Sequence, residues 1–174
     1  MTRNSHRAAE AVVKAYLSQT GTPFVPDDPR MLGMRLLPEV PFDLAAFPIG
    51  SAPLGLVVRS SNIKGNEKWS STTHTYLSLD KVLAADEWSK EHQVQLDPYV
   101  VYVMETVRPQ RLPVFEFADK HYHLVAVPTS QFRRHARPRA SDSWGKVQVS
   151  STVFEAIAVP LQRLVKPGGV GVAQ

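Results

Sequence analysis

Apolar side chains recur at helical spacing in two stretches of the chain. Across residues 5–18 they fall at every third or fourth position, which is typical of an amphipathic helix with one apolar face, and Gly21 follows as a helix-ending residue. The same spacing returns across 77–92, where Ser78 is the expected N-cap. The sequence therefore predicts two helices, and the Pro- and Asp-rich segment 20–30 after the first is predicted to be a loop.

Short apolar runs bounded by Pro and Gly predict strands in the rest of the chain. The run 99–107 is dense enough in β-branched and aromatic residues to be a central strand buried on both faces. The other predicted strands are 34–40, 42–49, 54–61, 113–119, 122–128 and 146–150, with a hairpin turn at 50–53. The polar segment 62–75 predicts a long loop, and a last short helix is expected from Thr152, which would form a capping box with Glu155.

This order of elements predicts the fold class. A helix, three strands, a helix and a strand, followed by further strands and a late helix, give a mixed central β-sheet flanked by helices, an α/β (α+β) arrangement. The chain has 174 residues, of which 43% are hydrophobic, which suits a single domain with one core. We expect this domain to cover 1–166 and residues 167–174 to form a flexible tail.

Composition narrows the choice of partner and compartment. The formal net charge is +4 and the isoelectric point is near 9.5, which favours nucleic acid as a large partner. The chain has no cysteine, which excludes disulfides, thiolate metal sites and cysteine nucleophiles and favours a reducing, cytoplasmic location. Because no apolar run is long enough for a signal peptide or a membrane span, we expect neither export by that route nor insertion in a membrane.

The αβββαβ order of the first 105 or so residues resembles the core of the restriction-endonuclease-like, or PD-(D/E)xK, superfamily, which includes Holliday-junction resolvases and many restriction enzymes. That family places an acidic residue at the start of the second strand and an acid-x-Lys triplet on the third, where they hold a divalent metal beside the scissile phosphate. Asp43 in FDLAAF stands in the first position. The segment VVRSS resembles the end of the third strand, so Val57 takes the place of the second acid and Arg59 that of the lysine.

Two departures from the family pattern change what the resemblance implies. Val57 cannot bind a metal, and Arg59 stays protonated, so it can stabilise charge but cannot act as a base. Family members sometimes supply a glutamate from the first helix or a displaced lysine, and Glu10 and Lys64 are the candidates here. The resemblance then implies a Mg²⁺ ion held by Asp43 and Glu10, with Arg59 as a phosphate clamp and Lys64 orienting water.

Each of these residues also has a plain structural interpretation. Asp43 could cap a turn or pair with Arg35, Glu10 could be a solvated helix residue, and Arg59 could form a surface ion pair that contributes little stability. The sequence leaves both interpretations open.

The densest positive charge in the chain lies at 131–146. Arginine guanidinium groups suit phosphate oxygens, and the rings of Phe132 and Trp144 flank the cluster and could stack on bases. The predicted nucleic-acid-binding residues are Arg133, Arg134, Arg137, Arg139, Trp144 and Lys146. The alternative is a solvated basic loop without a partner.

These features favour a DNA-binding protein of nuclease-like fold, with a metal-dependent phosphodiesterase site that is rearranged or lost. One rival is a protein-interaction or accessory module on an inactive nuclease scaffold, which predicts no metal dependence. Another is a single-strand or RNA binder that uses the arginine cluster and does not depend on Asp43. Many nucleases of this class act as dimers, so the resemblance also implies a homodimer.

Overall fold

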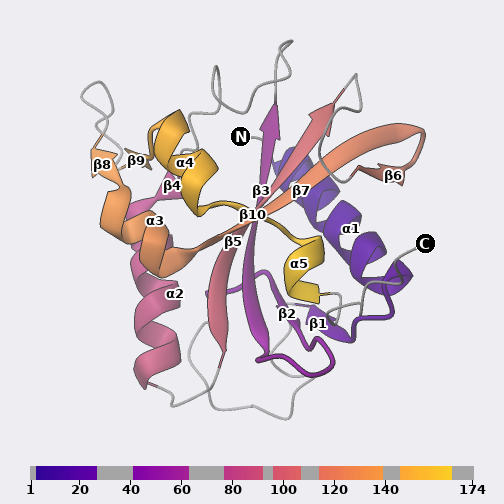
Figure 1. The fold of residues 1–174 in the computed structure, drawn as a ribbon, viewed down its shortest axis with the longest axis horizontal. Coiled ribbons are helices and arrows are strands. Elements are labelled where there is room, and N and C mark those ends of the chain that lie inside the picture. The colour runs from indigo at the N-terminus through magenta and orange to yellow at the C-terminus, as the bar shows by residue number, and fades with distance from the viewer. Residues whose placement is uncertain are drawn as a thin grey trace, which may run out of the picture.

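The computed structural model describes residues 3–26, 41–62, 77–91, 96–106, 114–138 and 146–165. Its helices are α1 (Arg3–Gln19), α2 (Leu79–Glu91), α3 (Thr129–His135), α4 (Ser151–Ile157) and α5 (Gln162–Val165). They lie on both sides of a central sheet, with α1 and α5 at the right of the strands in Figure 1 and α2, α3 and α4 at the left. The fold is therefore a three-layer α/β arrangement, as the element order predicts.

The central sheet is mixed. Its strands are β1 (Phe24–Pro26), β2 (Leu44–Ala46), β3 (Leu54–Asn62), β5 (Asp97–Thr106), β6 (Phe115–Phe117), β7 (Lys120–Pro128) and β10 (Val159–Pro160). They are arranged in the order β1-β2-β3-β5-β7-β10, with β6 paired to β7. The β3–β5 pair is parallel and the other pairs are antiparallel. A small second sheet pairs β4 (Leu77–Ser78), β9 (Lys146–Gln148) and β8 (Arg137–Pro138).

The central strand β5 is buried on both faces, as predicted for 99–107. Val101 and Val103 join the core under α1, while Val100, Tyr102 and Met104 join the core under α3 and α4. Each such side chain contributes about 1.5–3 kcal/mol when fully buried. The position of β5 between β3 and β7 explains why its sequence is apolar throughout instead of alternating.

The first and last described helices are joined through the core. Leu161 and Val165 pack in the same cluster as Val13 and Leu17 of α1. The Thr22 hydroxyl, just after α1, donates a buried hydrogen bond of 3.3 Å to the Val165 carbonyl, which is 143 residues away in sequence. The face of the sheet that carries α1 is therefore completed by the end of the described chain.

Most predicted elements are confirmed, with bounds that differ by a few residues. The helices predicted at 5–18 and 77–92 are α1 and α2, and the strands predicted at 42–49, 54–61, 99–107, 113–119, 122–128 and 146–150 are β2, β3, β5, β6, β7 and β9. The side chain of the expected cap Ser78, the predicted strand 34–40, most of the loop 62–75 and the tail 167–174 lie outside the described residues.

Three predictions about the elements were wrong. The loop predicted at 20–30 contains β1, whose residues pair with Ala46, Ala45 and Leu44 of β2. The cap of the late helix is Ser150, not Thr152, because the extended backbone of Ser150 lets its hydroxyl accept a 3.4 Å hydrogen bond from the Val153 N–H. That helix, α4, is also not the last, since α5 follows it.

Within the part of the chain that the structure describes, no helix has both the length and the apolar character needed to cross a membrane.

Candidate metal centre

Helix α1 brings two polar side chains to the sheet. Val13 and Leu17 are fully buried against it, and Glu10 and His6 continue the same stripe one and two turns toward the N-terminus. The stripe is apolar over the middle of the sheet and becomes polar where it reaches the start of β2. His6 and Glu10 are therefore held over the sheet by the packing of the helix.

Asp43 is fixed by its neighbours on β3. Its N–H donates to the Leu56 carbonyl at 2.9 Å, and its Oδ2 accepts the Val58 N–H at 2.7 Å, so the carboxylate extends the hydrogen-bonded edge of the strand. Arg59 Nη1 also lies 3.3 Å from Oδ2 and donates to the Val58 carbonyl. These contacts leave the other carboxylate oxygen, Oδ1, directed toward α1.

A close approach of two residues fixes the start of β2. A Cβ atom added to Gly55 would lie 2.6 Å from the ring of Phe42, the residue before Asp43. The Phe42 ring packs edge-on against Trp88 of α2, with centroids 5.5 Å apart. Glycine at position 55 therefore allows the ring, and with it the backbone that carries Asp43, to lie flat against β3.

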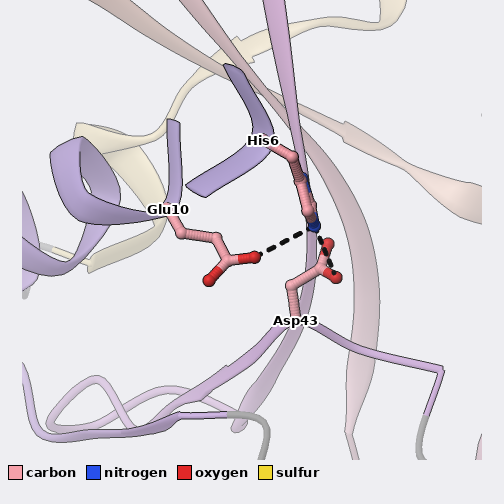
Figure 2. Close-up of side chains that lie close together, drawn as sticks. All are labelled: His6, Glu10 and Asp43. Atoms are coloured by element: carbon pink, nitrogen blue, oxygen red, sulfur yellow. Dashed lines mark ion pairs between the residues drawn. The ribbon is translucent and has the colours of Figure 1, made fainter. Parts of the chain in front are cut away.

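Three side chains converge at this point. His6 Nε2 lies 3.0 Å from Glu10 Oε1 and 3.4 Å from Asp43 Oδ1, and Figure 2 shows the imidazole lying between the two carboxylates. The Glu10 and Asp43 side chains are only 14% and 12% exposed. Lys14, one turn further along α1, lies 3.5 Å from the second oxygen of Glu10.

The structure brings together part of the predicted site. Glu10 and Asp43 meet, and Arg59 lies beside Asp43, whereas Lys64 lies outside the described residues. Val57 is 1% exposed and packs with Phe42, Ala85 and Trp88 on the α2 side of the sheet. The position of the second family acid is therefore part of the apolar core.

His6 was missed by the sequence reasoning. A histidine four residues before a glutamate on one helix face is a detectable signal, but its proximity to Asp43 depends on the tertiary fold. Arg35, the partner suggested for Asp43 in the structural interpretation, lies outside the described residues.

The two carboxylates fit a divalent metal. Their nearest oxygens lie within 4.8 Å of each other, and ligands on opposite sides of an ion with bonds of about 2.1–2.4 Å are separated by roughly 4.2–4.8 Å. Carboxylate oxygens are the donors that Mg²⁺ and Mn²⁺ prefer. The residues present can therefore hold such an ion.

A cavity of about 420 Å³ lies on the α1 side of the sheet and is lined by residues that neighbour those of the centre in sequence. Its walls include Ser5 and Ala9 next to His6 and Glu10, and Ser60 next to Arg59. On the far wall Lys120 and Glu105 form an ion pair of 3.0 Å, and this hydrogen bond raises the pKa of Lys120 above its ordinary value. The wall of this cavity therefore carries charges of both signs.

The predicted arginine cluster lies on the other face of the sheet. Arg133 and Arg134 are exposed in the last turn of α3, and Arg137 is exposed in β8. Helix α3 packs in the core opposite to that of α1. Arg139, Trp144 and the Lys146 side chain lie outside the described residues.

The expectation that Phe132 could stack on bases was wrong. Its side chain is fully buried against the sheet, because the segment that contains it forms a helix with an apolar face instead of a loop. The exposed arginines of this helix are held in place by that buried ring.

Comparison with known proteins identifies the fold. No protein-family model matches the sequence, and no curated protein matches it. The structure is similar to that of Hjc, a Holliday junction resolvase from the archaeal hyperthermophile Archaeoglobus fulgidus, with a TM-score of 0.52 and 12% sequence identity. The match covers 92% of this chain and 94% of the resolvase. The chain therefore has the nuclease-like, restriction-endonuclease-like fold over nearly its whole length.

Proposed function

We propose that this protein binds DNA and hydrolyses phosphodiester bonds with a divalent metal held by Glu10 and Asp43. The observation that carries the proposal is the convergence of two largely buried carboxylates, from elements 33 residues apart in sequence, on a nuclease-like fold. In this arrangement Glu10 of α1 replaces the acid that Val57 does not supply. The catalytic site is thus rearranged relative to the family pattern.

The surrounding residues support this chemistry in different ways. A bound divalent ion would offset the charge of a phosphate and make a bound water more acidic. Arg59 holds Asp43 Oδ2 and adds a permanent positive charge beside the centre, but it cannot accept a proton from water. Lys64 follows β3 closely in sequence and remains our candidate for orienting the attacking water.

The distribution of positive charge supports bent or branched DNA as the ligand. Arg133, Arg134 and Arg137 lie on the face opposite to the metal centre, so they would contact a different DNA segment from the one at the centre. Phosphate contacts of this kind hold DNA without reading its sequence. The fold similarity to a Holliday junction resolvase supports the same choice.

The first experiment incubates the protein with labelled single-stranded, duplex and branched DNA in Mg²⁺, Mn²⁺ or EDTA, and scores both mobility shift and cleavage. We expect a salt-sensitive shift under all three conditions and cleavage that EDTA abolishes. A shift without cleavage in any metal would limit the function to DNA binding. The absence of both the shift and the cleavage would overturn the proposal.

Replacing Asp43 with Asn tests the proposed role of this carboxylate. The amide oxygen can still accept the Val58 N–H, so the fold should survive, while the loss of charge should reduce cleavage by at least about 100-fold. DNA affinity should change little. Asp119→Asn, in an exposed turn with a positive φ that Asn tolerates, is the matched control, and cleavage that survives Asp43→Asn would refute the assignment.

A second function is favoured by two observations. The buried Val57 and the Arg59–Asp43 pair also suit a nuclease fold that has lost its activity and serves as an accessory or inhibitory module. This alternative predicts no divalent-metal binding and no dependence of DNA affinity on metal. The homodimer implied by the family also remains a prediction, which sedimentation of the free and DNA-bound protein would test.

A further inference from the structure

His6 is positioned as a third donor at the centre, which neither the family pattern nor the predicted carboxylate pair includes. Its Nε2 lies 3.0 Å from Glu10 Oε1 and 3.4 Å from Asp43 Oδ1. Ligands at adjacent corners of an octahedron or tetrahedron with bonds of about 2.1 Å lie roughly 3.0–3.4 Å apart. The distance from the imidazole nitrogen to each carboxylate oxygen is therefore the distance expected between two neighbouring ligands of one ion.

The oxygens that do not face His6 are held by other groups. Glu10 Oε2 is contacted by Lys14, and Asp43 Oδ2 by Arg59 and the Val58 N–H. Each carboxylate thus has one oxygen fixed by an outer partner and one directed inward. Such outer contacts orient the ligands of protein metal sites, so the three inward atoms form a prearranged set of one nitrogen and two oxygens.

A nitrogen donor changes which ions the centre prefers. Imidazole binds Mn²⁺, Co²⁺ and Zn²⁺ readily, whereas Mg²⁺ prefers oxygen ligands and retains much of its hydration. Two carboxylates alone would suit Mg²⁺, as the sequence predicts. The addition of His6 shifts the balance toward ions that accept nitrogen.

We propose that His6, Glu10 and Asp43 together bind one transition-metal ion of the Mn²⁺, Co²⁺ or Zn²⁺ type in preference to Mg²⁺. The proposal rests on the proposed metal centre but concerns the choice of ion, and it can be tested without DNA. It also gives His6 a role that an ion pair on the helix surface would not have.

The test is calorimetric titration of metal-free protein with Co²⁺ and with Mg²⁺, for the wild type, His6→Ala and the control His135→Ala on α3. His6→Ala should weaken Co²⁺ binding by more than about tenfold and change Mg²⁺ binding by less than about threefold. His135→Ala should leave both unchanged. Circular dichroism checks that each variant folds. If His6→Ala does not fold, His6→Asn replaces it in the titrations.

A spectroscopic measurement distinguishes whether His6 binds the metal ion directly or only lies near it. Pulsed electron paramagnetic resonance of Mn²⁺ bound to the wild type should show coupling to an imidazole nitrogen, and the coupling should disappear in His6→Ala. Equal loss of Co²⁺ and Mg²⁺ binding, or no nitrogen coupling, would overturn the proposal while leaving the carboxylate centre intact. Absence of all divalent-metal binding would overturn both, whereas selective Co²⁺ binding without DNA cleavage would support the proposal and refute only the hydrolytic function.

Discussion

Asp43 divides its two carboxylate oxygens between structure and proposed chemistry. Oδ2 is part of the edge of β3, through the Val58 N–H and Arg59, and Oδ1 faces His6. An amide can replace the first contact but supplies less negative charge for the second. At the scale of single residues, the structural and catalytic interpretations of Asp43 are therefore compatible, because each uses a different oxygen.

Replacing Val57 with Glu tests whether the missing family acid can be restored. The side chain at position 57 is buried among Phe42, Ala85 and Trp88, so we expect Val57→Glu to lower the free energy of unfolding by about 3 kcal/mol. The loss should grow as pH rises, because burial disfavours the charged carboxylate. Urea denaturation at two pH values measures this effect.

Val57→Leu is the control for size, with an expected loss of about 1 kcal/mol that does not depend on pH. A Val57→Glu protein as stable as the wild type, with tighter metal binding, would contradict the burial argument and show that the new carboxylate reaches the centre.

At the scale of elements, α1 and α3 lie on opposite faces of the sheet and carry different charged residues. Those of α1 are of both signs, and those of α3 are arginines. Helix α1 carries the His6–Glu10–Lys14 stripe beside its buried residues, and α3 carries Arg133 and Arg134 beside the buried Phe132. In both helices the apolar residues fix the orientation of the charged ones. The charged residues are thus presented by rigid elements and not by loops.

The double replacement of Arg133 and Arg134 by Ala tests the proposed DNA surface of α3. If each arginine contacts one phosphate, the slope of log affinity against log salt concentration should fall in magnitude by about 2. Fluorescence anisotropy with labelled DNA at several salt concentrations measures the slope. Arg163→Ala on α5, an exposed arginine on the other face, is the control, and an unchanged slope in the double variant would exclude this surface.

The sequence predicted elements well where burial produces a strong pattern. The runs that became α1, β3, β5 and β7 are long, periodic or uniformly apolar. The short strand β1 was missed because Phe24–Pro26 contains a proline and is a strand only through its pairing with β2. Helix α3 was missed because arginines dominate a short segment between Pro128 and Pro138.

The candidate site was predictable only in part. Asp43, Glu10 and Arg59 followed from a family resemblance, and the structure places them together. The nearness of His6 to Asp43 and the burial of Phe132 depend on how α1 and α3 pack on the sheet, which a one-dimensional pattern does not fix.

At the scale of the whole molecule, the proposed metal centre joins elements from two layers. Glu10 and His6 belong to a covering helix and Asp43 to the sheet, so a bound ion would link the two. An ion that binds the folded state alone stabilises it by an amount that grows with its concentration. Metal binding should therefore be visible in the stability of the entire chain.

Thermal unfolding with Mn²⁺ tests this link. At a concentration about 100 times the dissociation constant, the ion should stabilise the fold by about 2.7 kcal/mol and raise the melting temperature by several degrees. Glu10→Gln should remove most of this shift, whereas Glu155→Gln, exposed on α4, should retain it. An equal shift in both variants would place the ion elsewhere.

The hydrogen bond between the Thr22 hydroxyl and the Val165 carbonyl has a consequence for folding during synthesis. The core beneath α1 contains residues of the parallel strands β3 and β5, and it also needs Leu161 and Val165 from the end of the described chain. During synthesis, α1 emerges before the strands that it covers, and it cannot be fully covered until more than 140 residues have followed it. Contacts between residues so far apart in sequence slow folding. A nascent or truncated chain that lacks α5 would therefore carry His6 and Glu10 on a helix that is only loosely packed on the sheet. The proposed metal centre would then form only after α5 has been made.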